Sequence, residues 1–384
     1  MRRRLFVATI SAAAALTASS RATAQPIATA AAPNLTVVSQ GIAQGRGTQF
    51  VVRSQRAGRD FLVVVTVPVM PPMLPGQKSS AIYALDGGYG LVGASGWLLG
   101  GAGSMQAAYI VEIGYPLGGR ATREWDLLFK VGTRPDGTVA KGGGGAAFLS
   151  FLTEELKPFI ESRYPVAPDR GVLFGHSLGG IFTANVLAKH PEAFAGYLIA
   201  SPSVWAEPDI AARLSASRQK GPTRRVYVAW GGKEAAHMIT GGRQVALAVA
   251  TPSTVFVARR QVFKDAGHLD YYPALPNAAF PFLLPRSPPF LRPDEITVSG
   301  EHLRRYEGAY AFPDGSSIRV TRDGGNLFFA LGTRTAQRLA AETPERFFLP
   351  GMDLHITFEG TNDLPARRLR IVVNGDQASA MRVD

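Results

Sequence analysis

The sequence of 384 residues contains no cysteine. This excludes disulfide bridges, thiolate metal sites and attachment of a lipid through a cysteine. A chain of this length buries a core large enough to be stable without bridges. Hydrophobic residues make up 46% and charged residues 18%, which is typical of a folded protein with room for two domains and excludes global disorder.

Dense basic runs with interleaved aromatic residues are also missing, although the net charge is +12. The excess comes from scattered arginines. The sequence therefore gives little support for nucleic-acid binding, and it is compatible with a mild attraction to anionic substrates or to cell-envelope surfaces.

The apolar run near the N-terminus, Leu5–Ala18, is too short to cross a bilayer comfortably. It follows the basic Arg2–Arg4 and precedes Ala22–Ala24, which fits a signal-peptide cleavage site. We interpret residues 1–24 as a signal peptide and 25–33 as a flexible lead-in, with an uncleaved anchor as the alternative. The expected location is periplasmic or secreted, through the Sec or twin-arginine route, with no stable membrane insertion once the signal is removed.

Strand and helix patterns alternate between residues 34 and 284. This predicts an α/β domain with a mostly parallel sheet flanked by helices, and functional groups at the carboxyl ends of its strands. An antiparallel hairpin is expected at a sheet edge, and Pro158 is expected to kink or shorten a helix over 148–162. The strands are expected at 48–53 and 60–67 (the hairpin), 80–85, 108–114, 172–176, 197–200, 225–230 and 254–263.

After residue 284, the alternation of strand and helix patterns ends. Residues 285–296 are rich in proline and are expected to form a linker. Short strand patterns separated by turns fill 297–384, which predicts a small all-β domain, barrel-like or sandwich-like.

The stretch Gly175-His176-Ser177-Leu178-Gly179 joins an apolar strand pattern to a helical pattern. Strand, tight turn and helix follow in the order that a nucleophile elbow requires, with Ser177 at the tip. We expect the strand and the helix to approach each other closely at Gly175 and Gly179, where the Cβ of any other residue would collide. A purely structural turn is the alternative.

Attack by a serine on a carbonyl needs two N–H donors for the oxyanion. The residue after the nucleophile, Leu178, supplies one of them in such elbows. The glycine turn after the strand 80–85 offers Gly87 or Gly88 as the second donor, and a plain turn is an equally good interpretation of that stretch alone.

Serine also needs a base that a third group orients. Of the six histidines, His268 alone follows the last strand of the α/β region, where the order serine, acid, histidine places the base. Glu234 follows the preceding strand and is the expected acid, with Asp209 and Asp265 as alternatives. His176, inside the elbow, is not expected to take part.

Residues 47–283 resemble the putative esterase family of α/β-hydrolases, which includes bacterial enterobactin and salmochelin esterases. The resemblance implies a serine hydrolase of carboxylic esters with Ser177 and His268 as the core pair. The C-terminal part resembles small β domains appended to exported serine hydrolases, which implies an accessory or lid role. The matching stretches are 83–88, 123–126, 174–180, 201–205, 231–234 and 267–268.

We therefore expect an exported serine esterase that acts on a small-molecule ester and needs no metal or organic cofactor. Tyr89, Arg123 and Trp205 are candidates for substrate binding. A serine peptidase or acyltransferase on the same fold remains an alternative, and so does a catalytically silent binding protein, since a fold does not guarantee chemistry.

Overall fold

The computed structural model describes residues 35–43, 47–88, 90–117, 119–216, 222–250, 256–286, 293–360 and 364–384. The expected signal peptide and lead-in lie outside the described residues, as does the central part of the expected linker.

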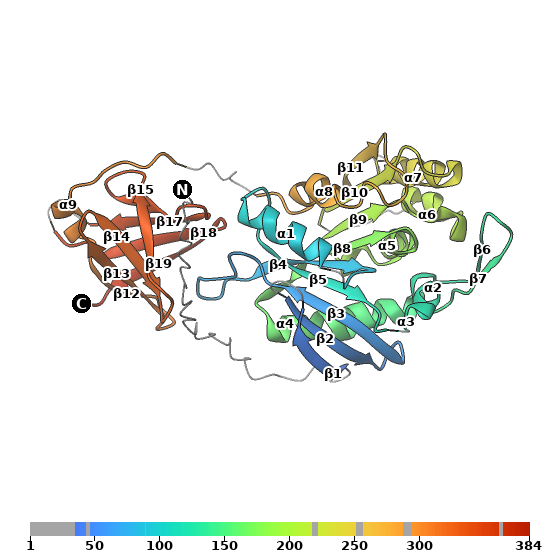
Figure 1. Ribbon diagram of the computed structural model, residues 1–384, viewed down its shortest axis with the longest axis horizontal. Coiled ribbons are helices and arrows are strands. Elements are labelled where there is room, and N and C mark those ends of the chain that lie inside the picture. Colours follow the sequence, from blue (N-terminus) through green and yellow to red (C-terminus); the bar gives the residue numbers. More distant parts are fainter. Residues whose placement is uncertain are drawn as a thin grey trace, which may run out of the picture.

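Nine strands of the described chain form one sheet (Figure 1). Neighbours pair antiparallel from β1 to β5 and parallel from β5 to β11, so the prediction of a mostly parallel sheet is confirmed. In their order across the sheet, the strands are β1 (Leu35–Ile42), β2 (Gly47–Ser54), β3 (Arg59–Thr66), β5 (Ala108–Gly114), β4 (Ser79–Leu85), β8 (Val166–His176), β9 (Gly196–Ala200), β10 (Arg224–Gly231) and β11 (Phe256–Phe263).

The hairpin of β2 and β3 forms as predicted, but its expected place at a sheet edge is wrong. Strand β1 pairs along the whole of β2 and takes the edge position. Only Leu35 and Val37 of β1 pack against the core, and the rest of the strand is exposed, so its apolar alternation is too short to mark a half-buried strand.

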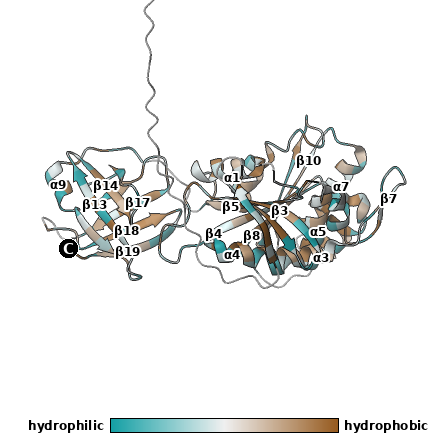
Figure 2. Ribbon diagram, turned by 60° about the horizontal axis from the view of Figure 1, so that its bottom comes forward, coloured by the Kyte–Doolittle hydropathy of each residue, from teal (hydrophilic) through white to brown (hydrophobic). Residues whose placement is uncertain are grey.

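Helices cover both faces of the sheet, so every residue of β4, β5 and β9 is buried. In Figure 2, the part of the sheet around β8 is coloured mostly as hydrophobic. One face carries α1 (Leu91–Gly101) and α8 (Leu275–Leu283). The other carries α3 (Gly145–Ser150), α4 (Lys157–Arg163), α5 (Leu178–Lys189), α6 (Ile210–Ala216) and α7 (Ala236–Val249), with the short α2 (Arg123–Leu127) and the ribbon of β6 (Gly132–Thr133) and β7 (Val139–Ala140) beyond them.

Helical backbone runs without a break from Gly145 to Arg163, so the expected shortening of the helix at Pro158 is wrong, and a kink there stays a prediction. A π-helical segment, Phe151–Leu156, lies between α3 and α4, directly before the turn that carries Pro158.

The C-terminal strands close into an antiparallel barrel beside the sheet (Figure 1), so the barrel form of the predicted all-β domain is confirmed. A short helix, α9 (Gly300–Arg304), precedes it. The barrel strands are β12 (Gly308–Ala311), β13 (Ser317–Asp323), β14 (Asn326–Leu331), β15 (Gln337–Ala341), β16 (Arg346–Phe348), β17 (Leu354–Glu359), β18 (Arg368–Val373) and β19 (Asp376–Arg382).

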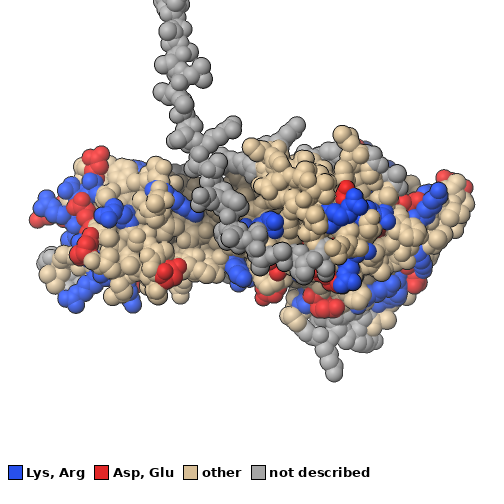
Figure 3. All heavy atoms as spheres, turned by 90° about the horizontal axis from the view of Figure 1, so that it is seen from below, with Lys and Arg blue, Asp and Glu red and all other residues tan. Residues whose placement is uncertain are grey.

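The loop after β3 belongs to the α/β domain and packs against the barrel. Met70 and Leu74 of this loop belong to the hydrophobic cluster of the barrel. A buried ion pair between Arg286 and Asp353 adds a polar contact, and Gln77 donates to the Val373 carbonyl at 3.2 Å. On the face in Figure 3, basic and acidic side chains are interspersed over both parts. No helix among the described residues is long and apolar enough to cross a membrane.

Candidate active site

Ser177 lies between the end of β8 and the start of α5, at the tip of a sharp turn. Its φ of 60° and ψ of −115° are strained for a residue with a Cβ, and strain of this kind is typical of nucleophile elbows. The turn is held by a hydrogen bond of 2.9 Å from the Ser177 N–H to the Ala200 carbonyl of the next strand.

The glycines of the elbow differ in how much space a Cβ would find at their positions. A Cβ on Gly175 would lie 2.0 Å from the Gly179 carbonyl oxygen, so the predicted close approach at Gly175 is present. A Cβ on Gly179 would find its nearest neighbour at 3.3 Å, whereas one on Gly180 would lie 2.5 Å from the Ala200 carbonyl oxygen. Gly180, rather than Gly179, is therefore the second position at which only glycine fits.

His268 and Glu234 meet as the sequence leads us to expect. The Nδ1 of His268 lies 2.6 Å from Oε2 of Glu234, whose side chain is fully buried. The alternative acids lie elsewhere: Asp209 pairs with Arg213 at 3.0 Å, and the exposed Asp265 pairs with Lys233 at 3.3 Å.

The other oxygen of Glu234 is also well bonded. Its Oε1 accepts hydrogen bonds of 2.6 Å from the Ser201 hydroxyl and from the Gly231 N–H. Burial alone raises the pKa of a carboxyl group, but the bonds from His268, Ser201 and Gly231 outweigh it and lower the pKa of Glu234. The carboxylate is held in its charged form.

Ser201 is a site residue that we did not predict. It follows β9 with a φ of 39°, and its buried hydroxyl also contacts the hydroxyl of Tyr271. Its place at the carboxyl end of a parallel strand does not single it out, because its role depends on the bond to Glu234, 33 residues away along the chain.

His176 also contributes, although we did not expect it to. Its Nε2 donates a hydrogen bond of 2.9 Å to the carbonyl oxygen of His268, and the two rings lie 4.6 Å apart. Burial, together with the nearby His268, lowers the pKa of His176 to about 4. The neutral ring thus supports the loop that carries His268.

Ser177 and His268 line one pocket of about 330 Å³. Within the described chain, Ser177 Oγ has a hydrogen-bond partner in Ser203 Oγ at 3.5 Å and none in His268. Hydrogen bonds between catalytic groups are often long without substrate and tighten when it binds. The structure therefore brings the pair to one cavity without joining the two side chains.

The donors expected for an oxyanion differ from one another. Leu178 begins α5, where the N–H groups have no partner within the helix. Gly87 is ruled out in this conformation because its N–H donates to the Ile113 carbonyl at 2.9 Å. Gly88 has a φ of +104°, which favours glycine, and its backbone N–H is among those that act on the Glu112 carboxyl, so its role stays a prediction.

Glu112 lies in the middle of β5 and lines the same pocket. Its side chain is only 1% exposed, and its Oε2 has no hydrogen-bond partner in the part of the chain that the structure describes. Burial raises the pKa of Glu112, although the backbone N–H groups of Val92, Gly93, Gly90 and Gly88 act against it. We did not predict this residue, and a lone acid within an apolar strand pattern was its signal.

The three candidates for substrate binding have different outcomes. Arg123 lines the pocket, but its guanidinium pairs with Asp86 through Nη2 at 2.7 Å, so its charge is compensated. Trp205 packs against the core beside the sheet, outside the residues that line this pocket. Tyr89 lies outside the described residues.

Comparison with known proteins adds independent findings. The model of the family described as "Putative esterase" matches residues 54–279. The ferri-bacillibactin esterase BesA of Bacillus subtilis is 30% identical over 268 residues, which cover 64% of this chain and 92% of the relative.

Solved structures share the fold. The BES protein from Bacillus cereus superposes with a TM-score of 0.53 at 24% identity, over 65% of this chain and 98% of its own. An IroE-like serine hydrolase from Shewanella oneidensis gives a TM-score of 0.54 at 18% identity, over 61% of this chain and 78% of its own.

Proposed function

The chain belongs to this esterase family and is a carboxylic ester hydrolase, and from this premise we propose that it works through an acyl-enzyme on Ser177. His268 is the general base, and Glu234 orients its ring. The observation that carries the proposal is the Glu234–His268 hydrogen bond of 2.6 Å in the loop that faces the Ser177 pocket.

In the first half of the reaction, the Ser177 hydroxyl attacks the ester carbonyl carbon and passes its proton to Nε2 of His268. The ionised Glu234 fixes the tautomer and stabilises the imidazolium that forms. The alcohol leaves with that proton, and water then repeats the sequence and frees the acid. Side chains and water suffice, so the proposed chemistry needs no metal or organic cofactor.

The oxyanion requires donors that are in place before the charge develops. We propose the Leu178 N–H at the positive end of α5 as the first donor. Gly88 is the proposed second donor, since the N–H of Gly87 is engaged in the sheet, and the Gly88 N–H would turn from the Glu112 carboxyl to the oxyanion.

We further propose a small-molecule ester of the siderophore type as the substrate, and export as the setting. The support for the substrate is the name of the Bacillus relative, a ferri-bacillibactin esterase. The support for export is the basic start, apolar run and cleavage pattern of residues 1–24. Fractionation of cells followed by N-terminal sequencing of the mature protein tests export, and a mature chain that still begins at Met1 would contradict it.

The nucleophile is tested with a fluorophosphonate probe and mass spectrometry. We expect a label on Ser177 in the wild type, no label in S177A, and a retained label in S203A, which removes the neighbouring hydroxyl. A wild type that stays unlabelled would favour a silent binding protein.

The leaving group is tested in parallel with a panel of esters, peptides and alcohol acceptors. Ester hydrolysis without peptide cleavage or acyl transfer is the expected result. Preferred turnover of peptides or of alcohol acceptors would contradict the proposal.

A further inference from the structure

A second cavity, of about 440 Å³, adjoins the Ser177 pocket. The two cavities share Asp86 and Gly87 as wall residues, so they meet at the loop that follows β4. A volume of this size is within the range of pockets that hold small molecules.

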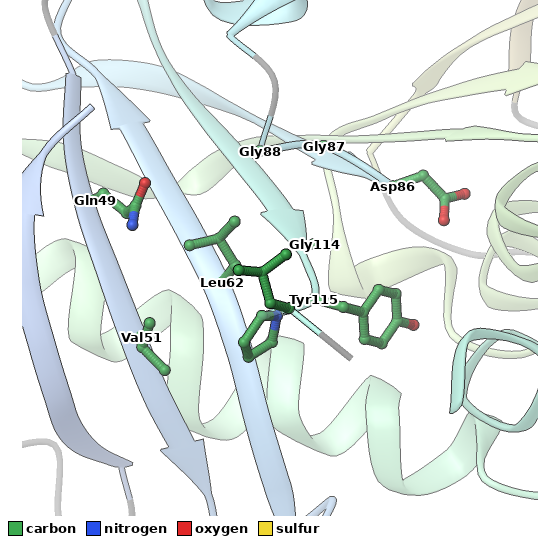
Figure 4. Close-up of a pocket in the computed structure, with 10 residues that line it drawn as sticks. Gln49, Val51, Leu62, Asp86, Gly87, Gly88, Gly114 and Tyr115 are labelled. Carbon is green, nitrogen blue, oxygen red and sulfur yellow. The ribbon is translucent and has the colours of Figure 1, made fainter. Parts of the chain in front are cut away.

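The walls of this cavity are mostly apolar (Figure 4). Val51 of β2 and Leu62 of β3 form the floor from the sheet, and Pro116 and Leu117 come from the loop after β5. Two neutral polar side chains also line the cavity, the amide of Gln49 from β2 and the phenol of Tyr115 from the loop after β5. These groups favour an uncharged, apolar ligand.

The single charged wall residue among those described, Asp86, is already compensated. Its carboxylate pairs with Arg123, which lines the neighbouring pocket and not this cavity. A charged ligand group would therefore find no free partner of opposite sign in this wall.

The loop between the cavities carries no side chain at its two central positions. It also lies close against the sheet, because a Cβ on Gly87 would be 2.5 Å from Cβ of Glu112 and one on Gly88 would be 2.9 Å from Cδ2 of Leu62. At Gly87, which lines both cavities, the loop presents backbone alone, so a substrate that reaches both cavities lies across this residue.

The position of His268 decides which part of an ester lies in the second cavity. Because His268 returns the proton to the leaving alcohol, the alcohol lies on the His268 side of Ser177. The second cavity lies beyond Asp86 and Gly87, and His268 does not contribute to its walls.

We propose that this cavity is the acyl subsite and that it selects esters whose acyl group presents an uncharged aliphatic or aryl part to this wall. This inference rests on the proposed function of Ser177. It adds the chemical class of the acyl group and the residues that recognise it.

The test compares p-nitrophenyl acetate with p-nitrophenyl octanoate and benzoate as substrates of two wall variants and one control variant. In the wall variants, V51D and L117D, a carboxylate enters the apolar wall. We expect kcat/KM for octanoate and benzoate to fall by at least about tenfold, because apolar contacts of a methylene or two are worth that much. We expect acetate turnover to change by less than about twofold.

L117D protects the test against misfolding, since Leu117 is fully exposed in a loop. V257D is the matched control, an exposed valine on the distant edge strand β11, and should leave all three rates unchanged.

Equal losses on acetate and octanoate in both wall variants would overturn the subsite. The subsite would also be overturned if the wall variants lost selectivity along a series of acetate esters that differ only in the alcohol. Failure of the proposed function is distinguishable, because then the wild type would neither turn over acetate nor be labelled at Ser177.

Discussion

Two buried glutamates border the site on opposite sides of Ser177, and the structure treats them differently. Glu234, on the His268 side, accepts hydrogen bonds on both oxygens, and its pKa is lowered. Glu112, on the β5 side, has one oxygen without a partner, and its pKa is raised. Burial disfavours the charge of both groups, so the hydrogen bonds decide the outcome. A carboxylate that is kept ionised orients an imidazole well, whereas a carboxyl group that resists ionisation orients it less well.

The largest effect is expected from E234Q, which removes the charge on the His268 side. The amide also offers an N–H where the imidazole N–H needs an acceptor, so the wrong tautomer is favoured. We expect kcat for ester hydrolysis to fall by about 10³ to 10⁴-fold with Ser177 still in place. Steady-state kinetics measure this, with D265N, an exposed acid of the same loop region, as the unchanged control. A loss below about tenfold would mean that His268 works without an acid.

Next in size is the effect of acid on stability through His176. Its folded pKa of about 4 lies below the ordinary histidine value, so its contribution is complete above pH 6.5 and is lost as the pH falls toward 4. The difference of 2.5 units corresponds to roughly 3 kcal/mol.

Urea unfolding of the wild type and H176F at pH 7 and pH 4.5 measures this contribution. H176F should be less stable at pH 7, because the His268 carbonyl loses its donor, and should lose less stability on acidification. H190Q, which changes an exposed histidine, should follow the wild type. A parallel decline in H176F and the wild type would contradict the assignment.

Much of the His268 side was predictable from the sequence, because each of its groups follows directly after a strand. The elbow glycines, His268 and Glu234 are local signals at strand ends, and the topology brings parallel strand ends together. What the pattern did not predict depends on contacts between strands. Ser201 and His176 act through partners 33 and 92 residues away along the chain.

The β5 side was less predictable for the same reason. Whether the Gly87 N–H is free depends on its bond to Ile113 of the neighbouring strand, which no local pattern encodes. Glu112 has the sequence context of a buried strand, and only the structure shows that it faces the Ser177 pocket. The mostly exposed strand β1 has an apolar alternation at Leu35 and Val37 only, which is too short a pattern to predict a strand.

A smaller change sharpens the role of the hydrogen bonds around Glu234. S201A removes one of the donors to Oε1 and leaves the Gly231 N–H in place. We expect the pKa of Glu234 to rise and kcat/KM to fall by about tenfold, the value of one hydrogen bond to a charged group. Ester kinetics against pH measure both effects, with S104A, an exposed serine, as the control. An unchanged profile would show that two donors suffice.

The smallest effect is expected from E112Q, and its sign is opposite to those above. Because burial raises the folded pKa of Glu112 above its unfolded value, ionisation destabilises the fold once the pH exceeds the unfolded pKa. A glutamine of the same shape does not ionise, so E112Q should have a higher Tm than the wild type at pH 8. The difference should vanish near pH 4, where Glu112 is protonated in both states. E192Q, at an exposed glutamate, should show no such gain. If E112Q were instead less stable at pH 8, the N–H groups of α1 would outweigh burial, and both glutamates of the site would be held as carboxylates.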